Sequence, residues 1–161
     1  MGLARALRGL DIKVKAREGN YFANITRTVV KGRARDAVRK LFDTVARAQE
    51  VAFSQICHGT TGAEVHNAVH EFFVKEGYKS GRRNGRVEGF FHGAGHGVGL
   101  EIHEPPRMSS GSNDILRSGH VVSVEPGLYY HELGGVRLED VALVTTKAPR
   151  NLTKFEKELE V

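Results

Sequence analysis

The sequence predicts an α+β fold built on a curved, mostly antiparallel sheet. Three observations carry this prediction. Residues 10–31 alternate apolar and polar side chains with the period of a strand, residues 34–77 carry apolar side chains at helical spacing, and the remainder consists of short apolar runs separated by Gly and Pro. Strands at both ends of a chain with helices between them are typical of this class.

The first segment predicts a β-hairpin. LDIKVKA alternates in the strand period, Arg17–Asn20 offers turn residues, and YFANITRTVV resumes with aromatic and β-branched residues. The two extended runs are therefore expected to pair with each other.

Two helices are expected next. The first runs from Ala34 to about Ile56, and its apolar residues fall on one face: Val38, Leu41, Phe42, Val45, Ala48 and Ala52. The second opens at Thr61 with a capping box to Glu64 and ends at Gly77. Its expected inward residues are Val65, Ala68, Val69 and Phe72, whereas His66 and His70 are expected on its surface.

Short strands are predicted in the C-terminal half at residues 89–91, 100–103, 121–125 and 136–144. Residues 79–86 form a basic stretch rich in Gly and lacking aromatic side chains, so a solvated loop is expected there and nucleic-acid binding is not.

The composition is that of one domain spanning residues 1–161, and no apolar run is long enough for a membrane span. The lone Cys57 excludes an internal disulfide and fits a reducing cytoplasm. We expect it to be a small buried residue near a helix end.

A candidate metal site comes from three histidines and two glutamates. His92, His96 and His103 alternate with glycines in EGFFHGAGHGVGLEIHEPP, while Glu125 and Glu139 lie in apolar, strand-like runs. One imidazole and two carboxylates meeting from separate strands would suit a divalent cation. The alternative is that these residues are ordinary parts of the structure.

These motifs, HGAGHGVGLEIHEPP, VVSVEPGLYY and GGVRLEDVALVT, together with NYFANITRTVVKG upstream, resemble the creatinase/aminopeptidase family of metallopeptidases. The resemblance covers about residues 10–146 and is closest to Xaa-Pro aminopeptidases and proline dipeptidases. It implies the pita-bread fold, with helices on the outer face of the curved sheet. This chain begins almost at the hairpin, so the N-terminal part of that fold is expected to be missing, and a homo-oligomer or a partner chain is expected to complete it.

The resemblance also implies roles for individual residues. His96, Glu125 and Glu139 match metal ligands, with Glu125 also acting in catalysis. His92 and His103 match histidines that handle the substrate carbonyl and backbone, and Arg137 matches an arginine that orients the acidic ligands.

Two positions depart from the family pattern. Two further aspartate ligands are implied on the hairpin, where this sequence has Lys13 and Asn24, and only a bulge would bring Asp11 to the first of them. A cation at position 13 opposes a second metal ion, or could pair with Glu139 in its place. We therefore expect at most one divalent ion (Mn, Co, Zn or Fe), with no ion as the alternative.

Three functions remain open from the sequence. The first is a metallopeptidase that removes an N-terminal residue by metal-activated water, with a partly degenerate metal site and a peptide or small-molecule substrate. The second is an inactive homologue that binds peptides or regulates a partner. The third is a metal-free, creatinase-like hydrolase that uses its histidines.

Overall fold

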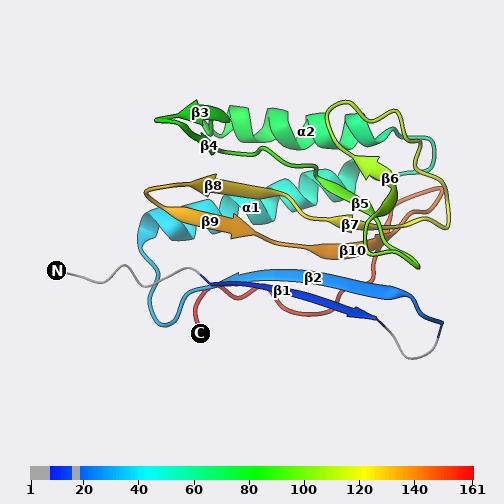
Figure 1. The fold of residues 1–161 in the computed structure, drawn as a ribbon, viewed down its shortest axis with the longest axis horizontal. Helices are drawn as coiled ribbons and strands as arrows, with labels where there is room; N and C mark the ends of the chain where they lie inside the picture. The colour runs from blue at the N-terminus through cyan, green and yellow to red at the C-terminus, as the bar shows by residue number, and fades with distance from the viewer. Residues whose placement is uncertain (1–7, 16–18) are drawn as a thin grey trace.

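The computed structural model describes residues 8–15 and 19–161. Strands β1 (Arg8–Lys15) and β2 (Phe22–Val29) form the predicted antiparallel hairpin, which lies along one side of the molecule (Figure 1). Their register is continuous and places Lys13 opposite Asn24 and Asp11 opposite Thr26. The pairing contains no bulge, so Asp11 does not take the place of Lys13.

Both predicted helices are present. Helix α1 spans Asp36–Gln55 and α2 spans Gly62–Lys75, and the capping box at the start of α2 is formed by Thr61 and Glu64. The inward residue near the end of α2 is Phe73, which is fully buried, rather than Phe72, which is half-buried. No helix in the described part of the chain is long and apolar enough to cross a membrane.

The central sheet is antiparallel and has the strand order β11-β10-β7-β5-β6. Its strands are β5 (Gly95–Gly97), β6 (Glu104–Met108), β7 (Val121–Val124), β10 (Asp140–Leu143) and β11 (Arg150–Asn151). Two separate hairpins complete the fold, β3 (Gly81–Arg83) with β4 (Arg86–Glu88), and β8 (Gly127–Tyr130) with β9 (Gly134–Arg137). The α+β prediction is thus confirmed.

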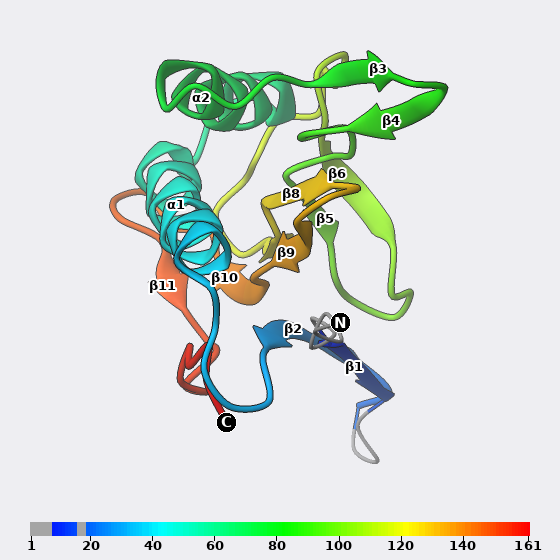
Figure 2. The same ribbon diagram turned by 90° about the vertical axis from the view of Figure 1, so that its left-hand side faces the viewer.

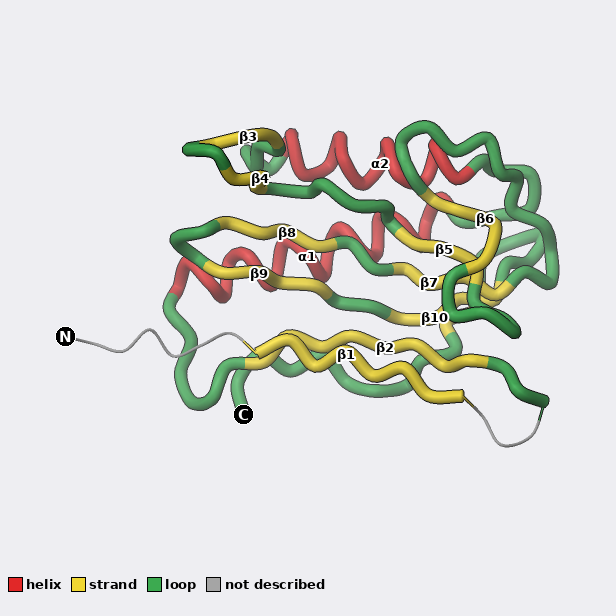
Figure 3. The backbone as a smooth tube through the Cα atoms, viewed as in Figure 1, coloured by secondary structure: helices red, strands yellow, loops and turns green. Residues whose placement is uncertain are grey.

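The helices lie on one side of the sheets, and the β1–β2 hairpin runs beside β10 at their lower edge (Figures 2 and 3). Helix α1 packs against β7, β8 and β9, and α2 packs against α1 and β6. Leu41 and Val45 of α1, Val65 and Val69 of α2, and Val122 of β7 are fully buried between these layers.

Several predicted strand positions were wrong. Residues 89–91 and 100–103 are not strands, whereas the Gly-His-Gly run forms β5, one of the inner strands of the central sheet. A Cβ at Gly95 would lie 2.0 Å from the carbonyl oxygen of Ser123, so the absence of a side chain lets β5 enter the sheet beside β7. The Pro105-Pro106 pair sits in β6, an edge strand, where proline's missing N–H is tolerated.

Two smaller expectations also change. The basic stretch 79–86 is not a loop but contributes to the exposed β3–β4 hairpin. Cys57 follows α1 as expected but is half-buried, with Sγ 3.9 Å from the Thr145 carbonyl oxygen.

Candidate metal centre

The structure brings His96, Glu125 and Glu139 together. His96 lies in β5, Glu125 follows β7 and Glu139 precedes β10. One ligand atom from each lies within 4.8 Å of the others, and His96 Nε2 is 3.1 Å from Glu125 Oε1. These are the only three residues in the described ranges that form such a group. One imidazole and two carboxylates suit Mn, Co, Zn or Fe.

His96 is held from both sides. Its Nδ1 faces the Gly97 carbonyl at 2.9 Å, so this nitrogen carries the proton and Nε2 is directed at Glu125. Its backbone N–H donates to Ser123 Oγ (3.0 Å), and the Ser123 hydroxyl donates to Glu125 Oε1 (3.2 Å). Such outer hydrogen bonds are what fix metal-ligating histidines in proteins.

The charges of His96 and Glu125 support each other. Burial opposes the charged imidazole, but the hydrogen bond to Glu125, the Gly97 carbonyl and the charge of Glu139 outweigh it and raise the pKa of His96. Burial likewise opposes the Glu125 carboxylate, yet His96 and Arg137 hold its pKa below the usual value. The Arg137 Nε lies 4.0 Å from Glu125 Oε2, and its role in orienting this glutamate stays a prediction.

Glu139 is joined to the hairpin. It is 1% exposed, and its carboxylate accepts a hydrogen bond from the Thr26 hydroxyl (2.5 Å). The two backbones also exchange hydrogen bonds, Glu139 N–H to Thr26 O (3.0 Å) and Thr26 N–H to Glu139 O (3.4 Å). Thr26, the first residue of the Thr-Arg-Thr motif within NYFANITRTVVKG, therefore supports the candidate ligand directly.

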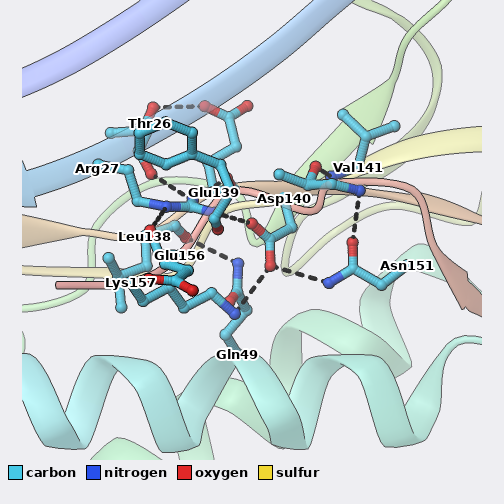
Figure 4. Close-up of polar contacts among 12 residues, drawn as sticks. Thr26, Arg27, Gln49, Leu138, Glu139, Asp140, Val141, Asn151, Glu156 and Lys157 are labelled. Carbon is cyan, nitrogen blue, oxygen red and sulfur yellow. Dashed lines mark hydrogen bonds and ion pairs between the residues drawn. The ribbon is translucent and has the colours of Figure 1, made fainter.

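Arg27, the arginine of that motif, lies at the centre of a buried network (Figure 4). Its guanidinium donates to the carbonyls of Thr26 and Glu139 and to Asp140 Oδ1, the last at 2.8 Å. It also donates to the carbonyls of Phe155 and Glu156 in the C-terminal tail. Asp140 is satisfied further by Lys157 (2.8 Å) and Asn151 (3.0 Å).

The hairpin positions 13 and 24 face each other near this site. Asn24 is 3% exposed, lies on the same face of β2 as Thr26, and its Oδ1 has no hydrogen-bond partner among the described residues. An amide oxygen of this kind is an additional oxygen donor suited to a divalent cation. The donor set therefore fits one ion.

The side chain of Lys13 is exposed, which weakens the like-charge penalty that it would impose on a metal ion. Its charge nevertheless reaches His103, an exposed residue whose pKa is lowered by slight desolvation and by the charges of His96 and Lys13. A pairing of Lys13 with Glu139 stays a prediction.

His92 and His103 border the same site. The His103 ring is 4.5 Å from the His96 ring, centroid to centroid, and His92 packs edge-on against Tyr129 at 5.4 Å. His92 lines a cavity of roughly 260 Å³ together with His96, Glu125 and Arg137. The His92 Nδ1 faces the Gly93 carbonyl at 2.7 Å, and its buried Nε2 has no partner among the described residues.

Some residues here were missed or misplaced by the sequence reasoning. His66 is not a surface residue; it is half-buried and stacks on Phe90 (4.8 Å), and burial with the charges of His70 and His92 lowers its pKa to about 4. Tyr129 was not singled out, although it follows Glu125 within EPGLYY. Burial raises the pKa of Tyr129, and this effect is larger than the lowering caused by the charge of Arg137.

The fold and this cluster resemble those of a class of metallopeptidases, and comparison with known proteins identifies the family within that class. Residues 10–146 match the model of metallopeptidase family M24, so the chain belongs to this family. The fold is the pita-bread fold that the resemblance implied.

Three relatives show how similar the chain is to individual proteins and how much of each it covers. The chain is 38% identical over 148 residues to the Xaa-Pro dipeptidase of Pyrococcus furiosus, covering 92% of this chain and 40% of the relative. Among solved structures, the X-Pro aminopeptidase from Thermotoga maritima MSB8 superposes with a TM-score of 0.83 and 32% identity, over 95% of this chain and 40% of that one. The prolidase from Pyrococcus horikoshii OT3 gives 0.83 and 36%, over 95% and 41%. The chain thus spans about 40% of the length of these relatives.

Proposed function

We propose that this chain forms the metal-binding part of a peptidase that removes an N-terminal residue, with Xaa-Pro peptides as its substrate class. The observation that carries the proposal is the convergence of His96, Glu125 and Glu139 within 4.8 Å. The substrate class rests on the names of the relatives, an Xaa-Pro dipeptidase, an X-Pro aminopeptidase and a prolidase.

Each residue has a part in this reaction. His96, Glu125 and Glu139 would hold the ion, which when bound activates a water molecule for attack on a peptide carbonyl. Glu125, hydrogen-bonded to Ser123 and close to His96, would take the proton from the water and pass it to the leaving amine. Arg137 would keep the Glu125 carboxylate in place.

The two remaining histidines have different chemistry. His103 is exposed and beside His96, so its ring can turn an N–H toward the developing oxyanion. In His92 the proton on Nδ1 is directed at the Gly93 carbonyl, which leaves the neutral ring's Nε2 as an acceptor. His92 is therefore better suited to accept a hydrogen bond from a substrate N–H.

We further propose that the site is partly degenerate and binds at most one divalent ion. In place of two carboxylates, the hairpin offers one amide oxygen at Asn24 and an ammonium at Lys13. Metal analysis after exhaustive dialysis should give one ion per chain or fewer. A stoichiometry near two would refute this proposal.

The site assignment is tested by Glu139→Gln. This change keeps the shape of the side chain but removes one ligand charge, so Mn²⁺ affinity measured by calorimetry should fall at least tenfold. Glu132→Gln, in the exposed β8–β9 turn, is the matched control and should leave affinity unchanged. Equal affinities for all three proteins would rule out the site.

A second candidate function is an inactive homologue that binds peptides, and Lys13 opposite Asn24 is the observation that favours it. Assays with Xaa-Pro dipeptides in excess Mn²⁺ separate the two candidates. Turnover that Glu125→Gln abolishes supports the peptidase, whereas peptide binding without turnover supports the binding protein.

A cytoplasmic location and association with a second chain are also proposed. Cys57 is the sole cysteine, which suits a reducing compartment. The outer strand β1 leaves the apolar side chains of Ile12 and Val14 exposed, and a second chain could cover them. A stable monomer by light scattering would contradict the association.

A further inference from the structure

The two candidate glutamate ligands lie where the pairing of neighbouring strands is interrupted. The β7–β10 ladder ends at the pair Val124–Asp140, and the β8–β9 ladder begins at Gly127–Arg137. Glu125 and Glu139 occupy the interval between the ladders. Buried carbonyls beside such an interruption need partners from elsewhere.

Helix α1 supplies those partners through one side chain. Gln49 is 1% exposed, and its amide nitrogen donates to the carbonyl of Val124 (2.8 Å) and to the carbonyl of Leu138 (3.2 Å). Each carbonyl belongs to the residue immediately before a candidate ligand. Figure 4 shows Gln49 rising from α1 toward Leu138, while the Glu139 carboxylate faces Thr26.

The carbonyl of one residue shares a rigid peptide plane with the nitrogen and Cα of the next. Holding the carbonyls of Val124 and Leu138 therefore holds the planes from which Glu125 and Glu139 project. Because both N–H groups belong to one planar amide, the two peptide planes are fixed relative to each other.

We infer that Gln49 is a positioning residue that sets the spacing of the Glu125 and Glu139 carboxylates. The inference rests on the proposed metal site. Packing alone does not account for the glutamine, because its own Oε1 is buried without a hydrogen-bond partner among the described residues, a cost that an apolar side chain would avoid.

The test is Gln49→Met, which keeps the volume of the side chain and removes both donors. Amide hydrogen exchange at Glu125 and Glu139 should become at least tenfold faster, and Mn²⁺ affinity should fall about tenfold or more, as for other residues that orient metal ligands. The matched control is Thr44→Val. Thr44 is a buried polar residue of the same helix, and its hydroxyl contacts the Lys40 carbonyl (2.8 Å) and the Tyr78 hydroxyl (3.4 Å), neither of which adjoins a candidate ligand. The Thr44→Val variant should keep the parent's amide exchange rates at Glu125 and Glu139 and its Mn²⁺ affinity.

Exchange and affinity within twofold of the parent in a folded Gln49→Met variant would overturn the inference, as would equal effects in Thr44→Val. If the parent binds no Mn²⁺, the proposed function fails, and the exchange rates alone decide the role of Gln49. If the variant does not fold, the role of Gln49 is decided in the parent by NMR. The measurement is of scalar couplings across the hydrogen bonds from the Gln49 amide nitrogen to the carbonyl carbons of Val124 and Leu138. Their presence supports the inference and their absence refutes it.

Discussion

The candidate metal centre has two sides that are supported very differently. On one side, Glu125 follows and Glu139 precedes a buried strand of the central sheet, where Gln49 of α1 and Arg27 of the inner hairpin strand β2 hold the backbone. On the other side, Lys13 lies on the outer hairpin strand β1, which exposes Ile12 and Val14, by 41% and 54%. The side that carries the two glutamates is also the side whose geometry is fixed by buried polar contacts.

This difference determines how freely each side of the site can change. A substitution at position 13 changes an exposed side chain on an edge strand, and the sheet does not depend on it. A change at Glu139 would disturb Thr26 and the strand junction as well. The outer strand β1 can therefore vary at lower cost in stability.

The largest expected effect is that of Arg27→Met, which removes the centre of the buried network. Asp140, 1% exposed, would lose one charged partner, and four backbone carbonyls would lose donors. Breaking a buried pair costs about 3–5 kcal/mol of unfolding free energy, measurable by urea denaturation. Arg39→Met is the control, because its pair with Glu160 is exposed and its loss should change the unfolding free energy much less. Similar losses for both variants would contradict the central part given to Arg27 in the buried network.

The next test makes the same substitution on both sides. Val124→Ala empties space beside Glu125 at a residue that is 0% exposed, and it should cost about 2 kcal/mol. Val14→Ala, at a residue 54% exposed, should stay within about 0.5 kcal/mol. Thermal denaturation of the two variants measures the difference, and equal losses would show that the hairpin is packed as firmly as the sheet.

The third prediction restores charge to the hairpin. Lys13→Asp with Asn24→Asp replaces an ammonium and an amide by two carboxylates opposite each other, so Mn²⁺ or Co²⁺ affinity should rise about tenfold, or about 1.4 kcal/mol. Calorimetry would measure both affinity and stoichiometry. If the double variant binds no better than the parent, positions 13 and 24 do not face the ion.

The smallest expected effect is on the stability of the protein at acidic pH. The hairpin residues 8–30 contain no histidine, whereas His66 of α2 has a pKa lowered to about 4 by burial and by His70 and His92. The unfolded chain, with a pKa near 6.5 at this position, then binds more protons, so stability should fall as the pH drops from about 6.5 to 4. His66→Phe keeps the stacking on Phe90 and should flatten this part of the profile in urea titrations. An unchanged slope would refute the assignment.

Local patterns in the sequence predicted the hairpin, both helices and the capping box, because each depends on residues near one another in the chain. The glycine-flanked His96 and the two strand-borne glutamates were also recognisable. Gln49 was not, although it lies four residues after Val45 on the buried face of α1, because its partners are 75 and 89 residues away. The β5 strand was missed because Gly-His-Gly has no strand propensity, and its place depends on close approach to Ser123.

The C-terminal tail, residues 147–161, shows that the part of the chain that holds the site extends beyond the family match. The match to the family stops at residue 146, yet Phe155 and Glu156 supply two of the oxygens that saturate Arg27, and Leu159 and Val161 pair with Val30. A fragment trimmed to the matched segment would retain all three candidate ligands. It would lose some of the contacts that hold Arg27, and with it the backbone of Glu139, in place. Boundaries chosen from alignment alone would then yield a protein whose weak metal binding reflects the cut rather than the chemistry.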